Sequence, residues 1–234
     1  MKKISTLIII IMGLLFISHN VIKAGELADS LKGKILLQVE SNGEAWYVKP
    51  SDSKKIYLKD GDVAYNVMRD LGLGISNADL FKIPIGFEDR FECVDSDGDS
   101  LCDKLEEGMG TNPYSNDSDG DSYDDGMEIR NNYNPLGAGI LTYDSNLADT
   151  LKGKILLQVE SRGEAWYINP DDNKRYYMTD GEAAYQIMRY LSLGITNTDL
   201  DKIVTEESIE YDTETQDGTE TQDGTETQDG TETQ

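Results

Sequence analysis

The sequence predicts an α+β chain in which two small modules flank an irregular acidic segment, followed by an acidic tail without regular structure. The first observation is a repeat: "LADSLKGKILLQVESNGEAWYVKP" at 27–50 returns as "LADTLKGKILLQVESRGEAWYINP" at 147–170. The match runs on to Ile83 and Ile203 at a constant offset of 120 residues. About two-thirds of the aligned positions are identical, so the repeated stretch is a folding unit.

The second observation is the distribution of charge. Formal net charge is -24, which excludes a basic surface for nucleic acid. Counting Lys and Arg against Asp and Glu gives 0 for 27–84 and -2 for 147–204, but -13 for 85–146 and -11 for 205–234. The nearly neutral blocks are the two module copies, and the acidic blocks are predicted to be a linker and a disordered tail that repeats a TETQDG unit.

Each copy begins with a strand pattern. Ile35, Leu37 and Val39 alternate with other residues at the period of a half-buried strand. "SNGEAWYV" supplies an Asn-Gly turn into a second strand, and "KKIYLK" fits a third. The copy therefore opens with three antiparallel strands.

A helical pattern follows the strands. Val63, Val67 and Leu71 have four-residue spacing, and Ser76 with Asp79 resembles a capping box for a second, short helix. We therefore expect three strands and two short helices per copy, a core that is marginal on its own.

Two aromatic pairs, Trp46–Tyr47 and Trp166–Tyr167, have two interpretations. Neighbouring strand residues point to opposite faces, so only one member of each pair needs to enter a core. Either Trp faces the helices and Tyr is half exposed, or one aromatic face recognises sugar rings or peptides.

Residues 1–24 resemble a secretory signal peptide. Lys2 and Lys3 precede an apolar run of about 14 residues, shorter than the roughly 20 of a spanning helix, and Ala24 suits cleavage. An uncleaved membrane anchor is the alternative. After cleavage we expect a secreted or cell-surface chain with no membrane span.

The acidic segment contains one pattern twice, as "DSDGDSLCDKLE" at 95–106 and as "DSDGDSYDDGME" at 117–128. Aspartates at spacing two in a tight loop can converge on one cation, and Ca²⁺ accepts about 6–8 oxygen ligands. Gly98 and Gly120 give the loops conformational freedom. The predicted ligands are Asp95, Asp97, Asp99, Asp103, Glu106, Asp117, Asp119, Asp121, Asp125 and Glu128, with the backbone carbonyls of Leu101 and Tyr123. The alternative is a disordered linker that holds metal weakly.

The only two cysteines, Cys93 and Cys102, bracket the first acidic loop. They could form a disulfide in an oxidising compartment or remain free thiols.

The order D-x-D-G-D, with "GTNP" at 110–113 and "NYNP" at 132–135, resembles the bacterial form of the thrombospondin type 3 repeat over about residues 93–137. The resemblance implies calcium bound along a compact segment that folds only with metal. Ser100 and Ser122 depart from it, because the family usually has glycine there. The module, through "KGKILLQVE" and "GEAWY", resembles one that recurs in exported and surface proteins of bacteria, without an established activity.

An enzyme is not expected, because the sole histidine, His19, lies in the signal and neither cysteine has a recognisable base partner. We expect an exported calcium-binding adaptor whose paired modules, held apart by a calcium-stiffened spacer, bind cell-wall glycan or surface proteins. The alternative is a structural surface-layer or fibre component whose modules self-assemble without a separate ligand.

Overall fold

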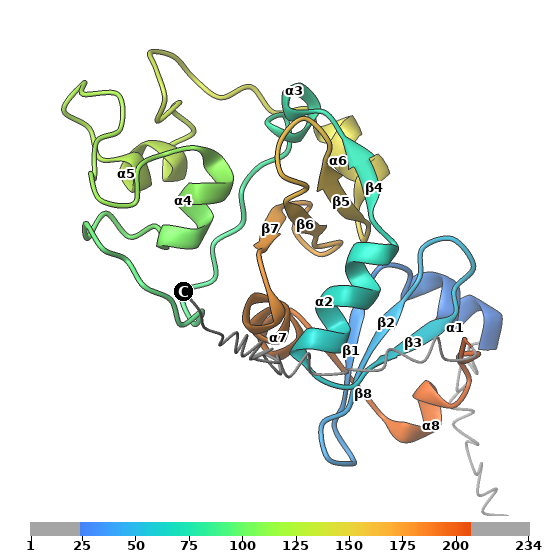
Figure 1. The fold of residues 1–234 in the computed structure, drawn as a ribbon. Coiled ribbons are helices and arrows are strands. Elements are labelled where there is room, and N and C mark those ends of the chain that lie inside the picture. Colours follow the sequence, from blue (N-terminus) through green and yellow to red (C-terminus); the bar gives the residue numbers. More distant parts are fainter. Residues whose placement is uncertain (1–23, 207–234) are drawn as a thin grey trace, which may run out of the picture.

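The computed structural model describes residues 24–206, so all but the last residue of the predicted signal and nearly all of the predicted tail lie outside the described residues. The described chain is α+β, with two four-stranded sheets and eight helices (Figure 1). The elements of the first copy are α1 Ala24–Ser30, β1 Ile35–Gln38, β2 Ala45–Val48, β3 Lys55–Leu58, α2 Gly61–Asp70, β4 Leu73–Ile75 and α3 Asn77–Leu80. Those of the second are α6 Ser145–Leu151, β5 Ile155–Gln158, β6 Ala165–Ile168, β7 Arg175–Met178, α7 Gly181–Tyr190, β8 Leu193–Ile195 and α8 Asn197–Leu200.

The three predicted strands of each copy form as expected, in antiparallel order. In the first copy Leu36 lies opposite Trp46, and Trp46 lies opposite Tyr57. The second helix also begins as predicted, because the Ser76 hydroxyl accepts a hydrogen bond from the Asp79 backbone N–H.

A fourth strand in each sheet comes from the other copy. Strand β4 of the first copy runs parallel to β5 of the second, and β8 of the second runs parallel to β1 of the first. The sheet orders are therefore β3-β2-β1-β8 and β4-β5-β6-β7. Two separate three-stranded modules were predicted, and this prediction is wrong. A parallel pair needs a crossover connection, and helices α2 and α7 provide it by carrying the chain across to the opposite sheet.

The exchanged segments are fixed by buried cations. The Lys55 ammonium donates to the carbonyl of Leu200 at 2.6 Å, and the Arg175 guanidinium donates to the carbonyl of Leu80 at 2.8 Å. Each cation thus meets the last carbonyls of a short helix from the other copy, where the helix end has unpaired acceptors. The exchange is reciprocal.

The two copies share one core between the sheets. Helices α2 and α7 pack against each other at its centre (Figure 1), with buried residues of both copies around them. Tyr47 donates its hydroxyl to the carbonyl of Gly153 at 2.6 Å, and Tyr167 donates to the carbonyl of Gly33 at 2.9 Å. The copies are therefore one body and are not held apart by the segment between them.

The aromatic pairs are largely buried. Tyr47, Trp166 and Tyr167 are at most 1% exposed, and Trp46 is partly buried. The tyrosines face the core around α2 and α7, while the tryptophans pack in outer clusters that include residues of the short terminal helices. The interpretation in which Trp faces the helices and Tyr is half exposed is wrong, because both tyrosines are buried and helices cover both faces of the sheets. Both members of the second pair are core, whereas in the first pair Tyr47 is core and Trp46 is partly buried.

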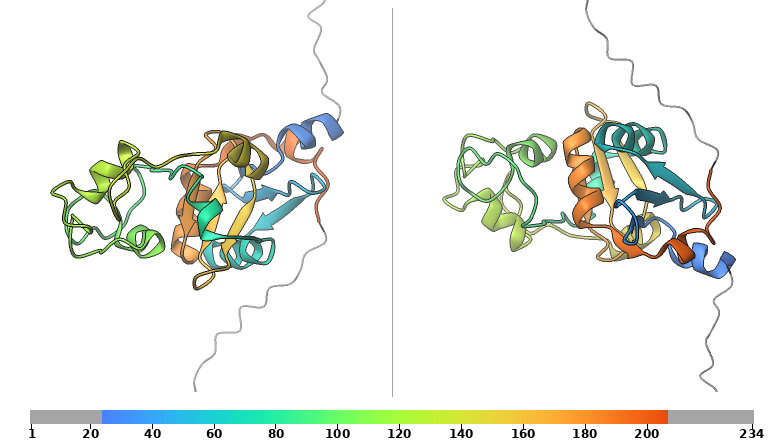
Figure 2. Two further views of the ribbon diagram at one scale, coloured as in Figure 1. Left: turned by 90° about the horizontal axis from the view of Figure 1, so that it is seen from above. Right: turned by 90° about the horizontal axis from the view of Figure 1, so that it is seen from below.

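The acidic segment forms a lobe at one end of the molecule (Figure 2). It holds two short helices that the sequence did not predict, α4 Asp103–Met109 and α5 Asp125–Arg130. Leu101, Met109 and Ile129 join a buried cluster that includes residues of the second sheet. In the described part of the chain, the helices are all too short or too polar to cross a bilayer.

One side chain attaches the beginning of the lobe to the body. The Gln186 amide on α7 accepts from the Glu92 backbone N–H at 2.8 Å and donates to the Glu92 carbonyl at 2.7 Å. Gln186 is buried, so both bonds are shielded from water.

Candidate metal centre

Each acidic loop is closed by its first aspartate. The Asp95 carboxylate accepts from the backbone N–H groups of Gly98 at 2.8 Å and Ser100 at 3.1 Å. Asp117 does the same with Gly120 at 2.7 Å and Ser122 at 2.8 Å. These bonds turn the chain tightly around its own carboxylates.

The glycines in the loops have the backbone conformation that the sequence suggested. Gly98 has φ +83° and Gly120 has φ +79°. An L side chain rarely adopts this left-handed region, so glycine at these places permits the turn.

Among residues 24–206, three groups of carboxylates have oxygens close enough to share a metal ion. Within each group the ligand atoms lie within 4.8 Å of one another. The groups are Asp95, Asp97 and Asp99; Asp117, Asp119 and Asp121; and Asp99, Glu106 and Asp125. The first two were predicted from the sequence as successive aspartates of one loop.

The third group joins the two repeats, which sequence reasoning missed. The Asp99 carboxylate accepts from the Leu101 N–H at 2.7 Å and from the Gly126 N–H at 2.9 Å. Gly126 lies at the start of α5, where an added Cβ would come within 2.1 Å of the Asp99 carbonyl oxygen. Asp99 and Asp125 are therefore buried between the repeats, whereas Asp121 of the second loop stays exposed.

Two buried glutamates of the lobe, Glu106 and Glu128, have strongly raised pKa values. Glu106 is fully buried and Glu128 is 7% exposed, and the Oε2 atom of each has no hydrogen-bond partner. Burial, followed by the charges of Asp97 and Asp99, raises the pKa of Glu106 to about 8.

The pKa of Glu128 is raised for the same physical reasons. Burial, followed by the charges of Asp121 and Asp119, raises the pKa of Glu128 to about 7. Burial is also the largest cause of a raised pKa at Asp99. Glu106 accepts one long hydrogen bond, from the Thr111 hydroxyl at 3.4 Å, but its Oε2 and that of Glu128 stay unpaired beside other carboxylates. Such buried groups suit a cation, because a positive charge offsets their desolvation.

The predicted ligand Asp103 has another role in the structure. Its carboxylate accepts from the backbone N–H and the hydroxyl of Ser96, both at 2.7 Å. Asp125 accepts from Ser118 in the same way but also belongs to the buried group with Glu106. Among the described residues neither Asp103 nor Glu128 belongs to the three groups, so ligation by these two residues stays a prediction. The bonds of Asp103 to Ser96 link the start of α4 to the first loop.

The remaining predicted residues lie as follows. The Leu101 side chain is buried in the core and the Tyr123 side chain is exposed; ligation by their carbonyls stays a prediction. Cys93 and Cys102 form a disulfide, and Cys102 is the N-cap residue of α4. The disulfide therefore ties the irregular segment that enters the lobe to the end of the first loop.

Two serines of the acidic loops have the left-handed backbone conformation that favours glycine. Ser100 has φ +74° and Ser122 has φ +80°. A left-handed residue with a Cβ costs about 1–2 kcal/mol, while glycine costs about 0.5–1 kcal/mol of chain entropy. We expect Ser100→Gly and Ser122→Gly each to raise the free energy of unfolding by about 0.5–1 kcal/mol in urea titrations. Ser100→Ala is the control, and an equal gain there would show that the hydroxyl, not the Cβ, is unfavourable.

Comparison with family models, curated proteins and solved structures gave no match.

Proposed function

We propose that this chain is an exported calcium-binding protein in which Ca²⁺ holds the acidic lobe folded against an α+β body that binds a partner at the cell surface. The observation that carries the proposal is the group of Asp99, Glu106 and Asp125, all buried, with Glu106 Oε2 unpartnered. A fully buried carboxylate among other carboxylates is unfavourable without a positive charge. A cation shared by both repeats supplies that charge.

The ligand chemistry favours calcium over other metals. Every side chain in the three groups offers carboxylate oxygen, which suits hard cations, and both cysteines are consumed by their disulfide. Zinc prefers nitrogen and sulfur ligands. Magnesium demands near-ideal octahedral geometry and retains water, whereas loops rich in bidentate carboxylates provide the larger, irregular shell of calcium.

Export is supported by the signal-like sequence and by the disulfide. Disulfides persist in oxidising compartments, where calcium is also abundant. The proposed partner is a cell-wall glycan or a surface protein. Because both copies belong to one body, the partner would meet a single surface rather than two sites at a set distance.

A structural role is the second candidate, and the strand exchange favours it. The pairing of β4 with β5 and of β8 with β1 joins two copies of the same unit, and copies from different chains could pair in the same way. Sedimentation velocity over a hundredfold range of protein concentration separates the candidates. Growing oligomers would support assembly, and a persistent monomer would support the adaptor.

The test of calcium binding is titration calorimetry on the full chain, with Glu106→Gln as the variant and Glu107→Gln as its matched control. Glu107 is exposed and pairs with Lys104 at 3.2 Å, so its loss should leave calcium affinity unchanged. Loss of the Glu106 charge should weaken calcium binding at the shared group by at least about tenfold, because ligand charge sets calcium affinity. The absence of saturable binding at millimolar calcium would reject the proposal.

A further inference from the structure

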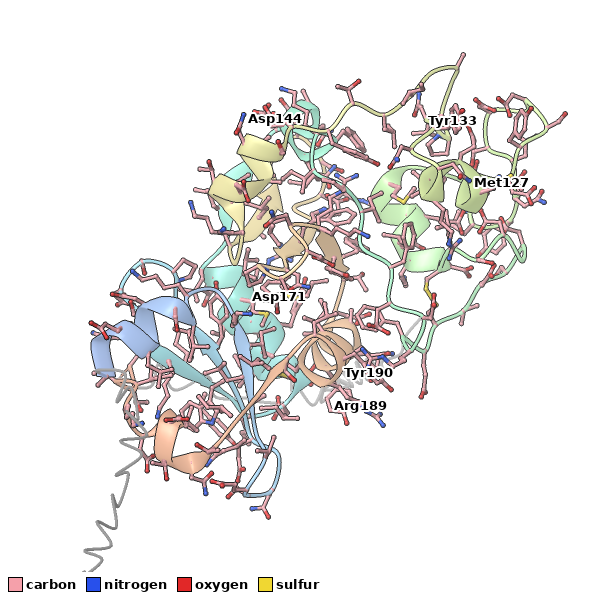
Figure 3. The ribbon with its side chains drawn as sticks, turned by 180° about the vertical axis from the view of Figure 1, so that it is seen from behind. Met127, Tyr133, Asp144, Asp171, Arg189 and Tyr190 are labelled. Carbon is pink, nitrogen blue, oxygen red and sulfur yellow. A yellow bond between two sulfur atoms is a disulfide. The ribbon has the colours of Figure 1, made fainter. Side chains whose placement is uncertain are left out.

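The two copies provide an internal comparison at one pair of positions. Lys34 and Lys154 are equivalent by the offset of 120 residues, as are Ser51 and Asp171. In one half of the body the Lys34 ammonium pairs with the Asp171 carboxylate, across the copies. At the equivalent place in the other half, Lys154 faces a position where serine replaces the aspartate. Figure 3 labels Asp171, which lies in the α+β body and away from the lobe that carries Met127.

A pocket occupies the place where this ion pair is missing. It has a volume of about 410 Å³, within the usual range for small-molecule sites. Ser51 and Lys154 line it together with apolar side chains of both copies, which are Tyr47, Leu71, Leu73 and Ile155.

Lys154 is a free cation in this setting. Among residues 24–206 its ammonium makes no ion pair and no hydrogen bond to a side chain or carbonyl. The pocket's other lysine, Lys49, is already neutralised, because it pairs with Asp52 at 3.1 Å and with Glu206. The pocket therefore combines apolar walls with a single uncompensated positive charge and the Ser51 hydroxyl.

We propose that this pocket binds a small organic carboxylate with an apolar body, whose carboxylate takes the place that Asp171 holds in the other half. The Lys154 ammonium and the Ser51 hydroxyl donate to the carboxylate, and a charge-assisted bond of this kind is roughly twice as strong as a neutral one. The apolar body covers Leu71 and Leu73, which are 39% and 48% exposed. This site is independent of the calcium lobe.

The probe is N-acetyl-leucine, with N-acetyl-leucinamide as its uncharged control, titrated into the ¹⁵N-labelled full chain in calcium. We expect saturable shifts of resonances around Ser51 and Lys154, and an affinity for the amide about tenfold weaker, the loss expected for one charge-assisted hydrogen bond. Equal affinities for the acid and the amide would overturn the proposal.

The chain itself suggests the variants. Ser51→Asp rebuilds the pair seen at Lys34 and Asp171, and should abolish binding of the acid by satisfying Lys154 from within. Lys154→Gln should weaken binding of the acid about tenfold by removing the charge. Urea titration confirms folding of each variant. A Ser51→Asp protein that folds and still binds the acid as tightly as the parent would reject the site.

The converse variant tests for gain of function. Asp171→Ser should free Lys34 and create a second site for the acid, detected as new shifts around residues 34 and 171. Because Asn169 stands where the first site has Lys49, the new site carries no second lysine. Failure of a folded Asp171→Ser protein to gain such shifts would show that an unpaired lysine at this position is insufficient, which contradicts the proposal.

Discussion

Calcium-free protein is expected to lose up to about 6 kcal/mol of stability in the acidic lobe as pH rises from 5 to 8, at roughly 1.4 kcal/mol per pKa unit. The groups responsible are Glu106 and Glu128, whose pKa values in the folded chain are about 8 and about 7. A carboxyl group whose pKa is higher in the folded chain than in the unfolded chain contributes to stability. The contribution is complete at pH values below the ordinary, unfolded-state pKa. That contribution is lost as the pH rises through the folded pKa, because a buried anion then forms. The lobe should thus be most stable near pH 5 without metal.

The measurement is urea unfolding of chelator-treated protein, followed by the near-ultraviolet circular dichroism of tyrosine at several pH values. Removing both titrating groups with Glu106→Gln and Glu128→Gln should flatten the pH profile, whereas Glu107→Gln should leave it intact. In saturating calcium the stability of the lobe should instead rise with pH. Protons and calcium compete for the same carboxylate oxygens, so calcium binding releases protons. A calcium-free protein whose stability rises between pH 5 and 8 would contradict the burial of these carboxyls.

The second large effect is expected at the contact between the copies. Gly33→Ala and Gly153→Ala should each lower the free energy of unfolding by about 3 kcal/mol or more, the sum of overpacking and left-handed strain. A Cβ on Gly33 would lie 2.2 Å from the Gly153 Cα, and a Cβ on Gly153 would lie 2.4 Å from the Gly33 Cα. The hydrogen bonds of Tyr47 and Tyr167 end on the same two residues, so separation would break them as well.

Gly43→Ala is the matched control for this experiment. Gly43 has φ +84°, close to the +76° of Gly33, but nothing lies within 4 Å of an added Cβ. Its substitution should therefore cost only the backbone term, about 1 kcal/mol. If chemical denaturation gave the same loss for Gly33→Ala and Gly43→Ala, the close approach of the two copies would be refuted.

The local elements could be predicted because their causes lie within a few residues. The three short strands, the spacing of Val63 and Val67, and the Ser76 cap each depend on neighbours along the chain. The half-buried pattern predicted for the first strand is wrong, because Ile35 and Leu36 are both buried and Val39 is exposed. The acidic loops are also determined by contacts between residues close in sequence. Aspartates at spacing two with a glycine between them turn the backbone by local hydrogen bonds, so the three carboxylates of each loop come together without help from elsewhere.

The partner of each strand could not be predicted from the repeat. Strand β4 is three residues long, and its pattern is the same whether it pairs within its own copy or with the other. The choice depends on the path of α2 and on the fit of Gly33 against Gly153, which are contacts between residues far apart in sequence. The burial of Trp166 and Tyr167 on opposite faces has the same origin, because covering both faces of a sheet requires elements from both copies.

The sequence by itself thus determined the repeated α+β unit, the capped helices and the two carboxylate loops, since local backbone geometry and side-chain period decide these. Tertiary structure alone decided the exchange of strands, the shared group of Asp99, Glu106 and Asp125, and the lack of an ion pair for Lys154 within the described part of the chain. The physical reason is that these depend on desolvation and close packing between distant segments. Such terms have no signature in the spacing of residues along the chain.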